Sequence, residues 1–155
     1  MDTRVTVTSS REALITEYQR VRRETETLCS PLAVDDYQVQ SMVQASPPKW
    51  HLAHVSWFFE AFVLPRFSPG YKAFNAQFDF LFNSYYYTHG EMHPRPRRGL
   101  LSRPTVDEVY RYRAEVDGSM RELMASVDDA QWQALAVSVI LGLNHEEQHL
   151  SLIHI

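Results

Sequence analysis

The fold is decided by residues 128–149, which read DDAQWQALAVSVILGLNHEEQH. Either Asp128 or Asp129 is a suitable N-cap for a helix. Four apolar residues follow at helical spacing: Trp132, Leu135, Val139 and Leu143. Near the end of the segment, His145 and His149 are four positions apart and would therefore point the same way from a helix. The segment predicts one long helix that carries a histidine pair.

Two further helices are predicted upstream. Residues 9–28 begin with Ser9 and Glu12, which have the spacing of a capping box. An apolar stripe follows them: Ala13, Leu14, Tyr18, Val21 and Leu28. Residues 47–64, PPKWHLAHVSWFFEAFVL, begin with two prolines that suit the first turn of a helix. Pro65 is expected to stop this helix.

Another helix is predicted after Thr105, which forms a second capping box with Glu108. Its side chains follow helical spacing: Val106, Val109, Tyr110, Arg113, Val116, Met120, Leu123 and Met124. Residues 65–104 are rich in turn residues and indicate one long connection, with a short helical piece near residues 78–86. No segment has the pattern of a strand. The sequence therefore predicts an all-α four-helix bundle with one long crossover loop, in a single domain over residues 1–155.

Length and composition narrow the function classes. The chain has 155 residues, which suits one domain, and its formal net charge of -4 argues against nucleic acid as the main partner. No apolar run approaches the roughly 20 residues that span a bilayer, and the N-terminal residues lack the apolar core of a signal peptide. Cys29 is the single cysteine, which fits a reducing compartment. We expect a cytoplasmic protein with no membrane partner and no nucleic-acid partner.

The histidine pair is a candidate metal site. Imidazole nitrogen is a common ligand of borderline metals, and the spacing of His145 and His149 aims both rings at one point. Two ligands seldom hold a catalytic ion, so a third must come from elsewhere in the fold. The helix predicted upstream offers His51 and His54, which differ in direction by about 60°. Three neutral histidines would leave positions open for substrate and oxygen, which suits ferrous iron as well as zinc.

Two other interpretations of the histidine pair stay open. The pair can be two ordinary polar residues on a solvated helix face. Alternatively, residues 145–149 satisfy the HExxH pattern of zinc hydrolases, in which Glu146 would be the general base. That pattern usually needs a third ligand downstream, where this chain has only His154. From their spacing, Glu146, Glu147 and Gln148 are expected on the helix surface, away from the side that the histidines share.

Four segments together resemble one known family: SPPKWHLAHVSWFFE, FNSYY, HPRPRRGLLSRPTV and HEEQH. Over about residues 10 to 150 and in the same order, they resemble the N-terminal DinB-like domain of the sulfoxide synthases of ergothioneine biosynthesis. The resemblance implies a four-helix bundle that supplies three histidines to a mononuclear non-haem iron, Fe(2+). It also implies an oxygen-dependent oxidoreductase that joins the sulfur of cysteine or γ-glutamylcysteine to the imidazole of hercynine.

The resemblance also implies roles for individual residues. It implies three iron ligands: His54, His145 and His149. It gives His51 a supporting role beside them. Arg95 and Arg98, three positions apart, resemble the pair that holds the carboxylates of the thiol substrate. Arginine suits that role because its charge is permanent and its planar head binds carboxylates bidentately. The alternative for these arginines is a solvated turn, or a patch that docks against a second domain.

The family has a further domain that this chain does not contain. A C-terminal domain resembling the formylglycine-generating enzyme completes the active site there and supplies the catalytic acid, so no catalytic side chain is assigned here. We therefore expect the chain to be a fragment that is inactive by itself. Its last residues, SLIHI, depart from the family pattern. The alternative functions are a stand-alone DinB-like metal-dependent thiol transferase and a non-catalytic helical module.

Overall fold

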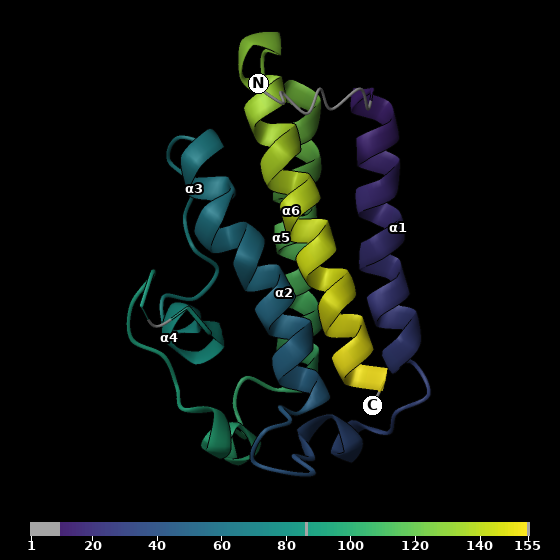
Figure 1. Ribbon diagram of the computed structural model, residues 1–155, viewed down its shortest axis with the longest axis vertical. Coiled ribbons are helices and arrows are strands. Elements are labelled where there is room, and N and C mark those ends of the chain that lie inside the picture. The colour runs from purple at the N-terminus through teal and green to yellow at the C-terminus, as the bar shows by residue number, and fades with distance from the viewer. Residues whose placement is uncertain (1–9, 86, 155) are drawn as a thin grey trace, which may run out of the picture.

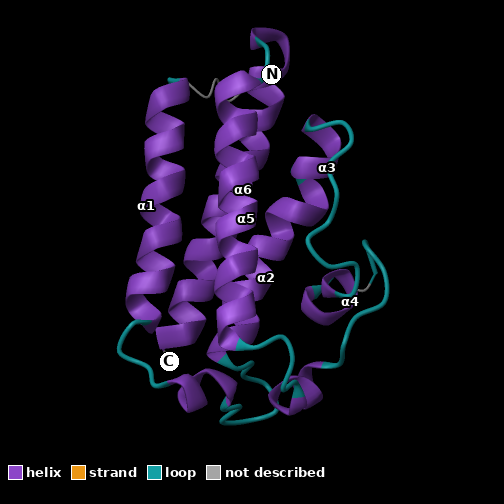
Figure 2. Ribbon diagram, turned by 180° about the vertical axis from the view of Figure 1, so that it is seen from behind, coloured by secondary structure: helices purple, strands orange, loops and turns teal. Residues whose placement is uncertain are grey.

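The computed structural model describes residues 10–85 and 87–154, and its core is a bundle of four long helices (Figure 1). These helices are α1 (Arg11–Cys29), α2 (Pro48–Phe62), α5 (Val106–Ser126) and α6 (Asp129–His154). α1 and α6 run in one direction and α2 and α5 in the other, so a long crossover joins two parallel helices (Figures 1 and 2). The described residues contain no β-strand. The predicted all-α bundle with one long crossover is confirmed.

Short helices interrupt the connections between the long ones. They are η1 (Val34–Gln38), α3 (Leu64–Phe67), α4 (Phe78–Phe82) and η2 (Arg95–Leu100), where η marks a 3₁₀ helix. α4 is the short piece that the sequence predicted. The prediction for Pro65 is wrong: α2 ends at Phe62, and Pro65 lies in the first turn of α3, where a missing backbone N–H costs nothing. Over the described residues, every helix is too short or too polar to span a bilayer.

Side-chain caps fix where the long helices begin. Ser10 caps α1 through its hydroxyl, whereas Ser9, the predicted cap, lies outside the described residues. At the start of α5, the Thr105 amide donates to Glu108 Oε2 at 2.6 Å, and the Glu108 amide donates to Thr105 Oγ1 at 3.2 Å. This is the predicted capping box. Asp128 caps α6 through its carboxylate.

α2 is the central helix of the bundle and packs against α4, α5 and α6. Every residue from Lys49 to Glu60 is buried, as expected for a helix with neighbours on several sides. Gly142 of α6 faces the ring of Phe59, and a β-carbon at this glycine would lie 2.5 Å from Phe59 Cε1. Because that β-carbon is missing, α6 comes close to α2, and side chains from the two helices meet.

Candidate metal centre

Three histidines meet between α2 and α6, toward the end of the bundle where α2 begins and α6 ends. His54 lies on α2, and His145 and His149 lie one turn apart on α6. One nitrogen from each ring lies within 4.8 Å of the others, and the Nε2 atoms of His54 and His145 are 3.1 Å apart. Two ligands at about 2.1 Å from one ion, at right angles, would be about 3 Å apart. The structure brings together the three residues that the resemblance implied.

The ring of His54 is fixed from three sides. Its Nδ1 lies 2.6 Å from the carbonyl oxygen of Phe82. Because a carbonyl only accepts, Nδ1 carries the proton and Nε2 presents its lone pair to the other histidines. The ring is stacked between Trp50, at 4.4 Å between centroids, and Trp57, at 5.5 Å. His54 is completely buried. This histidine is therefore oriented in advance as a ligand through Nε2.

The two histidines of α6 are held differently. Nδ1 of His149 lies 2.8 Å from Nδ1 of His51, so these rings share a hydrogen bond that leaves Nε2 of His149 for an ion. His51 thus has the supporting position that the resemblance gave it. The ring of His145 packs on Phe58 with 4.9 Å between centroids. Nδ1 of His145 is buried and has no partner among the described residues, so the polar contact of this ring is the one between its Nε2 and Nε2 of His54.

All four histidines are neutral at pH 7. Burial lowers the pKa of His51 and His145 to about 4 and, with help from the neighbouring rings, the pKa of His149 to about 3. Burial and the adjacent His149 and His145 lower the pKa of His54 well below its ordinary value. Metal ligation requires neutral imidazole, so the site needs no deprotonation step to bind an ion at pH 7. Three neutral nitrogen donors suit ferrous iron and zinc.

These pKa values predict how the stability of the metal-free protein depends on pH. Unfolded histidine has a pKa near 6.5 and the buried rings titrate at about 3 to 4, so the unfolded chain binds more protons between these limits. Stability therefore falls as the pH drops from about 6.5 to about 4 and is level just above that range. Urea midpoints at pH 7 and pH 5 measure the effect. His51→Phe should make the slope shallower, and equal midpoints in the wild type would contradict the prediction.

A cavity of about 530 Å³ opens beside His145 and His149, and Arg98 is one of the residues that line it. The guanidinium of Arg98 lies 3.6 Å from the ring centroid of Trp50, and its Nη1 donates to Ser46 Oγ at 3.0 Å. Its Nε and Nη2 are buried and have no partner among the described residues. Burial and the neighbouring Arg95 lower the pKa of Arg98 to about 9, which leaves it charged at pH 7. A buried cation with two nitrogens that lack a partner is suited to bind an anion.

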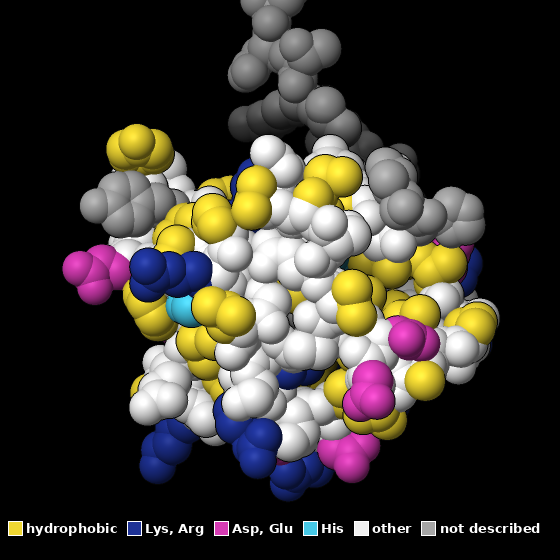
Figure 3. All heavy atoms as spheres, turned by 90° about the horizontal axis from the view of Figure 1, so that it is seen from below, with side chains coloured by type: hydrophobic (Ala, Val, Ile, Leu, Met, Phe, Trp, Pro, Cys, Tyr) yellow, Lys and Arg dark blue, Asp and Glu magenta, His cyan; other side chains and the backbone are white. Residues whose placement is uncertain are grey.

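Apolar side chains are exposed at the end of the bundle where this cavity opens, and two of them, Met42 and Leu152, line the cavity. Arg95 also lines the cavity but is exposed. Figure 3 looks onto this end of the molecule, where apolar side chains are spread over the surface. The surrounding segments expose six of them: Val34, Val39, Met42, Val43, Leu100 and Leu152. Several large apolar side chains exposed at one end of a molecule are typical of a surface that a partner covers.

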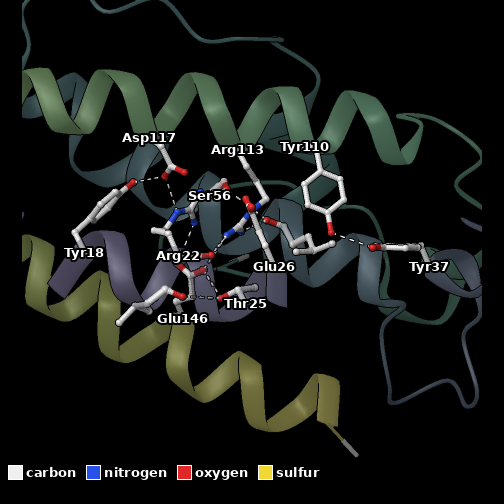
Figure 4. Close-up of polar contacts among 12 residues, drawn as sticks. Tyr18, Arg22, Thr25, Glu26, Tyr37, Ser56, Tyr110, Arg113, Asp117 and Glu146 are labelled. Carbon is white, nitrogen blue, oxygen red and sulfur yellow. Dashed lines mark hydrogen bonds and ion pairs between the residues drawn. The ribbon is translucent and has the colours of Figure 1, made fainter. Parts of the chain in front are cut away.

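Glu146 does not lie on the surface, so the prediction for this residue is wrong. Its side chain is fully buried, and it faces α1 and α5 instead of the histidines (Figure 4). Burial alone would raise the pKa of this carboxyl, but Arg22 and Arg113 outweigh it and lower the pKa to about 2. Both carboxylate oxygens are bound by the arginines, so Glu146 is not placed to act as a general base. This geometry opposes the HExxH interpretation. Glu147 and Gln148 are exposed, as predicted.

The sequence contained one indication of the buried ion pair between Arg113 and Glu146. Arg113 falls within the apolar stripe of the helix predicted after Thr105, and it is completely buried in the structure. A buried arginine needs a buried acidic partner. The stripe therefore pointed to a carboxylate on another helix, although it could not say which one.

The fold and these residues define a four-helix bundle with a candidate mononuclear metal centre built from three histidines. The chain matches the DinB superfamily over residues 17–153, which include all the histidines of the centre. This chain belongs to the DinB superfamily, whose members are often metal-dependent enzymes. No curated protein sequence matches it.

Proposed function

We propose that the domain holds one ferrous ion through His54, His145 and His149, and that it is the iron-binding part of an oxygen-dependent sulfoxide synthase of ergothioneine biosynthesis. One observation carries this proposal: His145 and His149, which meet His54, line the same cavity as the buried, incompletely bonded Arg98. The histidines would hold the ion, and the guanidinium would hold an acidic substrate beside it. The substrates would be hercynine, oxygen and either cysteine or γ-glutamylcysteine.

The residues around the cavity have separate tasks in this reaction. Bound iron would supply the redox chemistry with oxygen that the oxidative carbon–sulfur coupling requires. Because the three ligands are neutral, the site would keep its positive charge and favour an anionic thiolate. Arg98 lines the cavity and offers a charge and two nitrogens that have no partner among the described residues, which suits a carboxylate. Arg95 at the exposed mouth would attract the acidic substrate and take a second carboxylate.

The remainder of the site would come from a second domain of the same protein, as in the family that the sequence resembles. The apolar side chains exposed at the end of the bundle where the cavity opens support this proposal, because water would otherwise cover them. The second domain would supply the catalytic acid and most of the hercynine pocket. We place the protein in the cytoplasm, where a reduced, buried Cys29 would be stable.

The test is formation of a sulfoxide from hercynine and a thiol by the iron-loaded full-length protein, measured by product mass and oxygen uptake. Cysteine and γ-glutamylcysteine, assayed in parallel, identify the donor. Arg98→Met is expected to raise the KM for the thiol by about 10- to 100-fold, since a hydrogen bond to a charged group contributes roughly 1.5–3 kcal/mol. Arg97→Met is the control, because Arg97 is exposed on the same 3₁₀ helix. Equal KM values for the two variants would refute the role of Arg98.

A metal-dependent thiol transferase is the second candidate, because the proposed ligands and the anion-binding arginine all lie on this one domain. In that reaction the thiolate sulfur would displace a leaving group from an electrophilic carbon, and no oxygen would be consumed. Turnover of a thiol under anaerobic conditions, with no sulfoxide formed from hercynine in air, would favour the transferase over the synthase.

A further inference from the structure

We propose that Glu146 is a positioning residue for the metal centre: it fixes the rotation of α6 about its axis and so aims the two histidines of that helix at His54. This inference rests on the metal site proposed above. It assigns a function to the cluster of charged side chains in Figure 4, which has no part in binding the ion or the substrates. The cluster consists of Glu146, the arginines Arg22 and Arg113, and the acids Asp117 and Glu26.

The carboxylate of Glu146 accepts hydrogen bonds from side chains of two other helices, α1 and α5. Its Oε2 accepts a hydrogen bond from Arg22 Nη1 of α1 at 3.0 Å. Its Oε1 accepts from Arg113 Nη2 of α5 at 3.2 Å and from Thr25 Oγ1 of α1 at 2.6 Å. The side chains of Glu146 and Arg113 are completely buried, and that of Arg22 is 3% exposed. The strength of charged hydrogen bonds in a site without access to water depends strongly on their geometry.

The two arginines connect this carboxylate to α2 on both sides of His54. Arg22 Nη2 donates to Ser56 Oγ at 2.6 Å, and Arg113 Nη1 donates to the carbonyl oxygen of Leu52 at 3.0 Å. Leu52 and Ser56 are the residues two before and two after His54. The guanidinium groups therefore link Glu146, the neighbour of His145 on α6, with the turn of α2 that carries His54.

Apolar side chains lie on both faces of α6. The outer face of this helix also carries large apolar residues that are more than half exposed: Val137, Leu141 and Leu152. A rotation of about half a turn would bring these side chains into the bundle in place of the buried set. The same rotation would remove the Glu146 carboxylate from its partners and leave two buried cations without it, which is strongly unfavourable. Glu146 thus adds a charged contact to the close approach at Gly142 in setting the rotation of α6.

The other acids of the cluster lie nearer to solvent. Arg22 Nε pairs with Asp117 Oδ1 at 2.7 Å, and Arg113 Nε pairs with Glu26 Oε1 at 3.1 Å. The side chain of Asp117 is 24% exposed and that of Glu26 is 41% exposed, whereas Glu146 has no exposure. These two acids hold the arginines in place on α1 and α5. Glu146 is the acid that transmits their positions to α6.

The test is cobalt(II) binding to the purified chain, because the visible spectrum of this ion reports coordination as well as affinity. Glu146→Gln keeps the shape of the side chain and removes its charge. We expect a loss of affinity of about ten-fold or more and a shifted cobalt spectrum, as for other residues that orient metal ligands. The matched control is Glu147→Gln, since Glu147 is exposed and its ion pair among the described residues is with the exposed Arg20, at 3.0 Å. It should leave affinity and spectrum unchanged.

A second pair of variants separates positioning from stability. Leu135→Ala removes a fully buried side chain of α6 that lies about 15 Å from His145 along the axis, so it should lower the unfolding midpoint without changing cobalt affinity or spectrum. Thr25→Val removes one hydrogen bond to the Glu146 carboxylate and serves if Glu146→Gln does not fold. It should shift the spectrum in the same direction with a smaller loss of affinity.

The outcomes distinguish this inference from the proposed function. Wild-type cobalt affinity and spectrum in Glu146→Gln, or in Thr25→Val where Glu146→Gln does not fold, would overturn the positioning role and leave the metal centre standing. An equal loss of affinity in Leu135→Ala would also overturn it, because stability alone would then explain the effect. If the wild-type chain binds no cobalt, the metal centre itself is refuted and the positioning role falls with it.

Discussion

Replacing His54 by alanine is expected to lower the affinity for ferrous iron by more than about 100-fold, which exceeds the usual effect of a residue that only supports a ligand. The remaining pair on α6 supplies two nitrogens, and two ligands seldom hold a catalytic ion. His149→Ala should have an equally large effect. The measurement is an anaerobic titration with ferrous iron, in which the wild type should bind one ion per chain. His54→Phe should fail in the same way while keeping a ring between Trp50 and Trp57, which excludes a packing defect as the cause.

Two other histidines provide the controls for this experiment. His93→Ala should bind iron as the wild type does, because His93 bonds to the carbonyl oxygen of Arg97 and not to the cluster. His51→Phe should have an intermediate effect, about 10- to 100-fold, since it loses the hydrogen bond to His149 and removes no ligand. If a site for one ion per chain survives His54→Ala but not His149→Ala, His54 is not the third ligand. His51 would then be the next candidate.

The helices were predictable because their signals are local. Capping at Thr105 and Asp128 and the apolar spacing after them lie within a few residues of the ends they define. The end of α2 was not predictable in this way. Pro65 was expected to end the helix, but α2 ends three residues earlier, at Phe62, and the proline lies in the first turn of α3. A proline is compatible with either outcome, and packing of the following residues decides between them.

The metal centre was predictable only in part. The spacing of the pair on α6 is local, but spacing could not choose between His51 and His54, because both lie on α2 and the choice depends on where α6 crosses it. The resemblance made that choice. Glu146 was misjudged for the same reason. Its position on the helix shows that it faces away from the histidines, but not that two arginines from α1 and α5 lie on that side.

Gly142→Ala is expected to destabilise the protein by about 1–3 kcal/mol, the usual cost of overpacking a core. On its own, alanine would favour the helix by about 1 kcal/mol, so the sign of the effect is decided by the contact with α2. A β-carbon there would lie 2.5 Å from Phe59 Cε1 and 2.7 Å from Cζ. Phe59 is completely buried and packs edge-on against Tyr18, so its ring has no free space to enter.

Gly118→Ala on α5 is the matched control, because a β-carbon there would meet no atom within 4 Å. This variant should gain about 0.5–1 kcal/mol, the usual difference between alanine and glycine inside a helix. Urea unfolding of both variants at pH 7 measures the contrast, and equal stability would show that the approach of α6 to α2 is not limiting. Gly142 lies three residues before His145, so a helix pushed away at this point would also lengthen the 3.1 Å separation between His54 and His145. Gly142→Ala should therefore weaken metal binding as well, whereas Gly118→Ala should leave it unchanged.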